Sequence, residues 1–307
     1  MTKLKLGIAL GSGSARGWSH IGILKALNEK GIFPDIVCGT SVGAIVGASY
    51  VSNNIKKLES WVRTLTKIDI ARFLEINHSF NGFVNQERLH HFLHAYVAGD
   101  SVLIEESETQ YAAISTELAT GREVWHMDGP ILEAVCASMS LPGLFPAIKS
   151  QKRWLVDGGL VNPVPVSVCK ALGADIVIAV NLNGDLIGRH YNAPEQSSAP
   201  VKVVKAGGPL VNKVTDFMVE YTGSLFPSVK SDSQPPGLFD AIAGSVHITQ
   251  DRITRSRLAG DPPDLLIAPR LSHIGLLEIY RANEAISEGE ESVRRLLPEI
   301  KDVLELV

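Results

Sequence analysis

The sequence predicts an α/β fold whose central sheet is mainly parallel and covered by helices on both faces. Strand-like and helix-like segments alternate along the first half of the chain. Some strand-like runs, above all Asp175–Val180, are apolar at successive positions and not only at alternate ones. Such runs indicate strands buried on both faces, as in parallel sheets whose crossover helices lie on either side. The 307 residues suffice for one large domain of this kind.

The N-terminal elements form a strand–helix–strand unit. Leu4–Leu10 is expected to be a buried strand, and Ile36–Cys38 a second one. Trp18–Lys30 is expected to be a helix, because apolar residues recur on one face and Gly31 ends the pattern. The later expected helices are Asn54–Leu65, Glu87–Tyr96, Pro130–Met139 and Val166–Leu172, and the later expected strands are Tyr111–Ser115, Val124–His126, Trp154–Val156 and Asp175–Val180.

Composition divides the chain into three parts of one structural domain. Residues 6–182 hold the strand–helix alternation and are expected to form the core. Residues 183–247 are rich in Pro, Ser and Gly, with an interrupted helix at Val203–Tyr221, and predict a flexible insertion or a lid over the site. Residues 248–307 are expected to pack on the core. Their expected elements are the helix Ile248–Leu258, the strand Leu265–Ala268 and the helix Leu276–Leu297.

Charge and hydropathy exclude several classes of protein. The formal net charge is −4 and the pI is about 6.1, and no dense Lys/Arg cluster supports nucleic-acid binding. The apolar stretch at the N-terminus ends at Gly11, which is too early for a signal peptide, and no run approaches the length of a membrane span. We therefore expect a soluble, cytoplasmic protein with no nucleic-acid partner. No oligomeric state is predicted.

Neither cysteines nor histidines show the spacing of a metal site. The cysteines lie in apolar surroundings without a C-x-x-C pair, which is typical of buried thiols in a reducing compartment; they are Cys38, Cys136 and Cys169. His90, His91 and His94 follow Glu87 on one expected helix, but no H-E-x-x-H is present and the apolar stripe defines the buried face. These histidines are expected to face solvent, and neither a metal nor a cofactor is expected.

The most informative motif is Gly39-Thr40-Ser41-Val42-Gly43, which reads G-x-S-x-G between an expected strand and an expected helix. A serine at such a turn is exposed at a helix N-terminus, and Gly39 and Gly43 allow the tight turn and close packing that the turn requires. The motif therefore predicts Ser41 as a nucleophile for acyl transfer. The alternative is an ordinary strand–helix turn, for which the same residue types are common.

A second motif follows the first strand, in the loop Gly11-Ser12-Gly13-Ser14-Ala15-Arg16-Gly17. Small residues before a helix let several backbone N–H groups point into one concavity that suits a phosphate or a developing oxyanion. A dinucleotide fingerprint fits poorly, because Arg16 occupies the third glycine position and no acidic residue ends the second strand. An oxyanion hole beside Ser41 is the preferred interpretation, and a plain strand–helix turn is the alternative.

The third motif is Asp157-Gly158-Gly159, directly after the expected strand Trp154–Val156. A D-G hairpin turn is one interpretation. However, Pro163 and Pro165 follow closely, and two prolines cannot lie in a paired central strand. Asp157 is therefore expected to end a strand and to face the same edge of the sheet as Ser41, where carboxyl ends of strands converge.

Taken in this order, the three motifs resemble those of the patatin-like phospholipase family. The resemblance extends to Trp18–Leu24, Ala137–Pro146 and Asp157–Pro165, and covers residues 6–182. The tail around Leu258–Asp264 resembles the short bacterial members of the RssA type. The resemblance implies a three-layer α/β/α patatin-like fold with a catalytic core at residues 6–182. One departure stands out: Ser12-Gly13-Ser14 occupies the place where family members usually carry three glycines.

The resemblance also implies a mechanism and a substrate. Ser41 would be the nucleophile and Asp157 the base of a dyad without histidine, and N–H groups around Gly13 and Ser14 would hold the oxyanion. Arg16 would shape the loop or add positive potential. An aspartate base requires either a pKa raised by burial or slow turnover. The substrate would be an acyl ester or a phospholipid, reached through transient contact with a membrane surface.

Two alternatives remain at this stage. A Ser-His-Asp triad would place its histidine late in the chain, at His247 or His273, but nothing in the sequence ties either to the site. A regulatory or adaptor protein could retain the fold with weak or no hydrolysis. The intact Ser41, Asp157 and Arg16 favour a serine acyl hydrolase over an adaptor.

Overall fold

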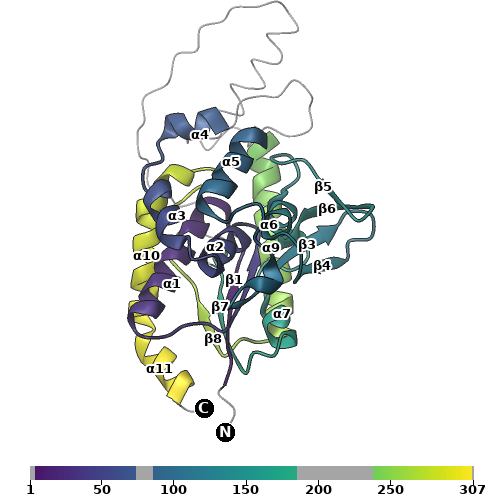
Figure 1. The fold of residues 1–307 in the computed structure, drawn as a ribbon. Helices are drawn as coiled ribbons and strands as arrows, with labels where there is room; N and C mark the ends of the chain where they lie inside the picture. The colour runs from purple at the N-terminus through teal and green to yellow at the C-terminus, as the bar shows by residue number, and fades with distance from the viewer. Residues whose placement is uncertain (1–3, 74–85, 185–237, 306–307) are drawn as a thin grey trace, which may run out of the picture.

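The computed structural model describes residues 4–73, 86–184 and 238–305, and a single mixed sheet forms the centre of this part of the chain (Figure 1). Its strand order is β5-β6-β3-β2-β1-β7-β8, with β4 also paired to β3. The strands are β1 (Leu6–Leu10), β2 (Ile36–Thr40), β3 (Gln110–Glu117), β4 (Glu123–His126), β5 (Ile148–Ser150), β6 (Arg153–Asp157), β7 (Ile176–Val180) and β8 (Leu265–Ile267).

The five strands from β3 to β8 in this order run parallel, and β4, β5 and β6 add antiparallel pairs at one side. β1, β2 and β7 are buried along their whole length, as expected for strands covered on both faces. The predicted α/β class with a mainly parallel central sheet is therefore confirmed. The boundaries of the predicted strands agree within one or two residues, and β5 was not predicted.

Helices cover the sheet on both faces, which gives three layers. The larger core packs one face, including Ile8 and Leu10, against α1, α2, α6 and α10. The smaller core packs Ala9 and Cys38 against α7 and the end of α9. The helices are α1 (Ser19–Glu29), α2 (Val42–Val51), α3 (Ile55–Val62), α4 (Lys67–Phe73), α5 (Gln86–Tyr96), α6 (Ile131–Met139), α7 (Val166–Ala171), α9 (Leu238–Gly260), α10 (Ala282–Arg295) and α11 (Leu297–Glu305), with 3-10 turns η1 (Ser14–Trp18), η2 (Ile104–Glu106), η3 (Gly158–Leu160) and η4 (Ile279–Arg281). Within the described ranges, no helix combines the length and apolar character needed to span a membrane.

The point where the ends of β2 and β6 meet sets the position of the site. β3 pairs with β4 along one edge, and on the other edge it pairs first with β2 and then with β6. Thr40 pairs with Ile114, and Asp157 pairs with the next residue, Ser115. β2 and β6 run in opposite directions, so their carboxyl ends meet head-on beside β3. Residues at these two ends are therefore neighbours in space although they are far apart in sequence.

The structure differs from the sequence-based expectations in the C-terminal third. The predicted helix Ile248–Leu258 is part of the longer α9, which crosses the expected boundary at residue 247. The helix predicted for Leu276–Leu297 starts later than expected: η4 begins at Ile279, α10 spans Ala282–Arg295, and α11 follows as a separate helix. The predicted interrupted helix at Val203–Tyr221, and most of the predicted insertion, lie outside the described residues. α10 and α11 contribute to the larger core, and β8 extends the sheet beside β7.

Candidate active site

Ser41 sits in a sharp turn between β2 and α2, in a backbone conformation that is costly for a residue with a side chain. Its φ is 58° and its ψ is −121°, a combination that costs on the order of 1–3 kcal/mol unless the surroundings enforce it. Packing does enforce it, because a Cβ atom on Gly43 would lie 2.1 Å from the carbonyl oxygen of Leu10. The Ser41 N–H donates to Ser138 Oγ at 2.9 Å. The turn therefore holds Ser41 in place at the start of α2.

The hydroxyl of Ser41 meets the carboxylate of Asp157. Ser41 Oγ donates to Asp157 Oδ2 at 2.6 Å, and the N–H of Gly159 donates to Asp157 Oδ1 at 2.7 Å. Asp157 is 1% exposed, and this burial raises the pKa of its carboxyl to about 6, although the two hydrogen bonds lower it in part. A carboxylate in this range can accept a proton from a hydroxyl near neutral pH. The pair can therefore activate Ser41 as a nucleophile.

Asp157 ends β6 and leads into η3, so the D-G hairpin interpretation was wrong. Gly158 and Gly159 form the start of η3, where the Gly159 N–H bonds the aspartate side chain. A Cβ on Gly158 would lie 2.1 Å from the Ile114 carbonyl oxygen, so this residue has no room for a side chain. The turn thus fixes Asp157 against β3, at the end of β2.

The loop after β1 carries two backbone N–H groups beside this pair that have no acceptor in the described part of the chain: those of Gly13 and Ser14. The neighbouring groups are engaged, since Gly11 donates to the Val180 carbonyl and Ser12 to that of Pro163. Further on, Ala15 and Arg16 donate to the carbonyls of Leu276 and Gly13, respectively. Gly13 and Ser14 line the same cavity as Ser41. Of the loop residues predicted from the sequence, these two carry the N–H groups that could bind an oxyanion.

Ser14 shows how the chain accommodates a serine at a position where the resembling family usually has glycine. Ser14 has a φ of 50°, in the left-handed region, and its hydroxyl donates to the Leu276 carbonyl at 2.6 Å. This hydrogen bond ties the loop to the segment before η4 and offsets part of the backbone cost. Gly17 lies in η1. It was predicted to be part of the oxyanion hole, but it does not line the cavity.

Arg16 is fully buried and does not line the cavity. Its Nε donates to the Gly13 carbonyl at 3.2 Å, and its Nη2 donates to Asn183 Oδ1 at 3.1 Å and contacts His247 Nε2 at 3.0 Å. Arg16 thus contacts the loop at Gly13 and does not line the cavity; its predicted parts in shaping the loop and in the oxyanion hole stay predictions.

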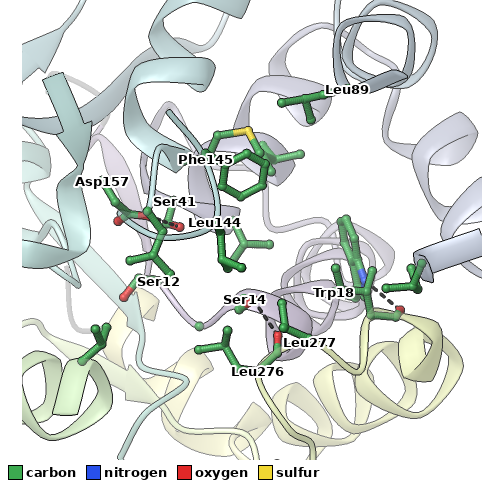
Figure 2. Close-up of a pocket in the computed structure, with 18 of the residues that line it drawn as sticks. Ser12, Ser14, Trp18, Ser41, Leu89, Leu144, Phe145, Asp157, Leu276 and Leu277 are labelled. Atoms are coloured by element: carbon green, nitrogen blue, oxygen red, sulfur yellow. Dashed lines mark hydrogen bonds between the residues drawn. The ribbon is translucent and has the colours of Figure 1, made fainter. Parts of the chain in front are cut away.

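The cavity of about 150 Å³ is polar at one end and apolar elsewhere. Figure 2 shows Asp157, Ser41 and Ser12 together, with Leu144 and Phe145 beside them and Leu89 and Trp18 farther away. The apolar lining comes from α2, α3, α5, the segment after α6 and the segment before η4, and includes Ile45, Trp61, Leu89, Phe145, Leu276 and Leu277. Such a cavity can hold a hydrocarbon chain with its polar end at Ser41.

The histidines considered from the sequence lie in three different places. His247 lines the cavity and contacts Arg16, a location that the sequence did not indicate, whereas Ser41 donates to Asp157 and not to a histidine. His273 lies elsewhere, exposed and bonded to Glu284. His90 and His94 are exposed and each bonds Asp100 at 3.2 Å. No cluster of His, Cys, Asp and Glu in the described residues could hold a metal ion.

Sequence reasoning missed three residues that support this arrangement. Ser138 holds the backbone of Ser41, Asn183 bonds Arg16 and the loop, and Gln250 bonds Asn183. Ser138 lay in a stretch that carried the family resemblance, which was a usable signal. Asn183 and Gln250 lay in or near the segment expected to be flexible, and single polar residues in such segments carry no local signal.

Comparison with known proteins is consistent with this geometry. Residues 8–170 match the family model described as patatin-like phospholipase. An uncharacterized NTE family protein of Mycobacterium tuberculosis is 30% identical, over 93% of this chain and 89% of that protein. Lysophospholipase NTE1 of Pyricularia oryzae is 26% identical over 97% of this chain and 19% of that protein. Patatin-like phospholipase domain-containing protein 6 of Homo sapiens is 30% identical over 59% of this chain and 14% of that protein. The RssA-type assignment stays a prediction.

Proposed function

This chain belongs to the patatin-like phospholipase family, and from that membership we propose that it is a serine acyl hydrolase that cleaves lipid esters through a Ser41–Asp157 dyad. One observation carries the proposal: the Ser41 Oγ–Asp157 Oδ2 hydrogen bond of 2.6 Å at the polar end of an apolar cavity. The family and the lysophospholipase name of the fungal relative support lipid hydrolysis as the class of reaction.

The proposed reaction has two halves. Ser41 Oγ attacks the ester carbonyl as its proton passes to Asp157, and the N–H groups of Gly13 and Ser14 bind the oxygen that becomes negative. The intermediate then expels the alcohol, which takes the proton from Asp157. A water molecule gives a proton to Asp157 and attacks the acyl-enzyme. The fatty acid leaves, and the proton returns to Ser41.

The cavity supports an acyl chain as the part of the substrate that is bound. Its apolar side chains, such as Leu89 and Phe145, would bury methylene groups at about 0.8 kcal/mol each. Ser41 lies at the polar end of this cavity, so a lysophospholipid or phospholipid would place its acyl chain in the cavity and its head group beyond Ser41. Transient contact with a membrane surface is part of the proposal, because a phospholipid must leave a bilayer to enter this cavity.

The test is hydrolysis of a panel of p-nitrophenyl esters and lysophospholipids by the purified protein and by Ser41→Ala. Ser60→Ala is a matched control, since Ser60 is an exposed serine whose hydroxyl bonds only the Lys56 carbonyl. We expect hydrolysis by the wild type and Ser60→Ala, and loss of at least about 10³-fold in Ser41→Ala. A folded wild type that hydrolyses none of the panel would favour the adaptor alternative instead.

A further inference from the structure

The peptide units that carry the Gly13 and Ser14 N–H groups are held from behind through their carbonyl groups. The Ser12 carbonyl shares a peptide plane with the Gly13 N–H and accepts from Asn183 Nδ2 at 3.4 Å. The Gly13 carbonyl shares a plane with the Ser14 N–H and accepts from both Arg16 Nε and the Arg16 backbone N–H, each at 3.2 Å. In a trans peptide the C=O and N–H groups point in opposite directions. Groups that bind these carbonyls therefore set the direction of the two N–H groups.

Asn183 connects the two anchors. Its Oδ1 accepts from Arg16 Nη2 at 3.1 Å, while its Nδ2 donates to the Ser12 carbonyl and to Gln250 Oε1 at 3.3 Å. Its own backbone N–H donates to Asn181 Oδ1 at 3.0 Å, which fixes the residue just after β7. Asn183 and Arg16 are both fully buried, so water does not compete for these bonds. One side-chain amide thus touches one peptide unit directly and holds the guanidinium that touches the other.

We propose that Asn183 is a positioning residue for acyl transfer: it orients the Gly13 and Ser14 N–H groups toward the oxygen that becomes negative at Ser41. The proposal rests on the proposed function and assigns to Asn183 a role within it. Gln250 extends the network to α9, because it accepts the second Nδ2 hydrogen of Asn183. The orientation of the loop after β1 is therefore coupled to α9, which lies far from this loop in the sequence.

Orientation of these donors affects the transition state more than the bound ester. An ester carbonyl carries little charge, whereas the tetrahedral intermediate carries a full negative charge on the same oxygen. Misaligned donors should therefore lower kcat and leave KM nearly unchanged. A trifluoromethyl ketone forms a tetrahedral oxyanion on the nucleophile. Misaligned donors should therefore also weaken the binding of such a ketone, by the same factor by which they lower kcat/KM. A purely structural role would lower the folded fraction and leave both values per active site unchanged.

The experiment compares Asn183→Leu with Asn54→Leu as a matched control. Asn54 likewise donates its Nδ2 to a backbone carbonyl, that of Val97 at 3.1 Å, but it does not line the cavity. Rates are expressed per mole of Ser41 labelled to completion by a fluorophosphonate, and a melting curve checks each fold. We expect kcat to fall about 10- to 100-fold in Asn183→Leu, with the inhibition constant of the ketone rising by the same factor. Asn54→Leu should lose stability with kcat unchanged.

Several results would overturn the positioning role. Equal kcat in folded Asn183→Leu and wild type would do so, as would a loss of kcat without a matching loss of ketone affinity. If the wild type hydrolyses no ester, the proposed function fails on its own, and a crystal structure of Asn183→Leu decides the inference separately. Rotation of the Ser12–Gly13 peptide in that structure supports it, and an unchanged peptide with Arg16 still on Gly13 contradicts it.

Discussion

Ser41 Oγ and Asp157 Oδ2 lie 2.6 Å apart across 116 residues of chain because β2 and β6 end at neighbouring residues of β3. The contact is thus a property of the sheet and not of a flexible loop. A proton can pass between the two side chains without a rearrangement of the backbone. The consequences of this relationship can be tested one by one.

Replacing the aspartate should separate activity from stability. The Asp157 pKa is raised from 3.8 to about 6, so the folded protein binds this proton more tightly than the unfolded chain does. Stability from this group is present at low pH and is lost as the pH rises from about 4 to about 6, by about 3 kcal/mol in total. Asp157→Asn keeps the shape without the charge. The free energy of unfolding of Asp157→Asn minus that of the wild type should therefore increase as the pH rises from about 4 to about 6. This increase should persist at pH 7.

Urea unfolding at pH 4, 5, 6 and 7 measures this difference. A stability difference between Asp157→Asn and wild type that does not change with pH would mean that the carboxyl titrates normally in the fold. Ser41→Ala, with Asp157 intact, is the control, because it should retain most of the pH dependence.

The rate of hydrolysis should depend on the same carboxyl. Asp157 must be ionised to accept the Ser41 proton, so kcat/KM should fall tenfold per pH unit below about 6 and level off above it. A neutral short-chain ester is the suitable substrate, since it does not titrate itself. A profile that stays flat down to pH 5 would exclude Asp157 as the base.

Backbone strain at Ser41 should appear as a difference between two inactive variants. Its φ of 58° and ψ of −121° suit glycine better than any residue with a Cβ. Ser41→Gly should therefore be more stable than Ser41→Ala by about 1–3 kcal/mol. Chemical denaturation of both proteins gives the difference. Equal stabilities would indicate that the turn relaxes once the serine side chain is removed.

Narrowing the far part of the cavity should change the preferred acyl chain. Leu89 of α5 lines the cavity away from Asp157 and is partly exposed, so a larger side chain can be accommodated there (Figure 2). Leu89→Trp should lower kcat/KM for long-chain p-nitrophenyl esters by about fourfold per methylene group excluded. The butyrate ester, which stays near Ser41, is the internal control. Equal effects on both esters would place the acyl chain elsewhere.

Local patterns in the sequence predicted most strands and helices of the core and identified the three motifs that meet at the candidate site. Apolar runs such as Ile176–Val180 and the G-x-S-x-G motif can be recognised from neighbouring residues alone, so their interpretation needed no tertiary information. The meeting of Ser41 and Asp157 was expected from the convergence of strand ends. The structure reaches it differently, because β6 is antiparallel to β3.

Elements that depend on distant contacts could not be predicted. The turn between β5 and β6 uses Gln151 and Lys152 at positive φ, without the glycine that usually indicates such a hairpin. The chain before η4 is not helical, and there the Leu276 carbonyl accepts from both Ser14 Oγ and the Ala15 N–H. Nothing local to Leu276 indicates this role. The contacts of Asn183 with the loop after β1 are hidden for the same reason.

Fluorophosphonate labelling followed by intact-mass analysis and peptide mapping tests the Ser41–Asp157 dyad most directly. The wild type should gain a single adduct on Ser41, Ser41→Ala should gain none, and Asp157→Asn should react at least about 100-fold more slowly at pH 7. Two results would contradict the dyad: folded wild-type protein that remains unlabelled, or Asp157→Asn that is labelled as fast as the wild type.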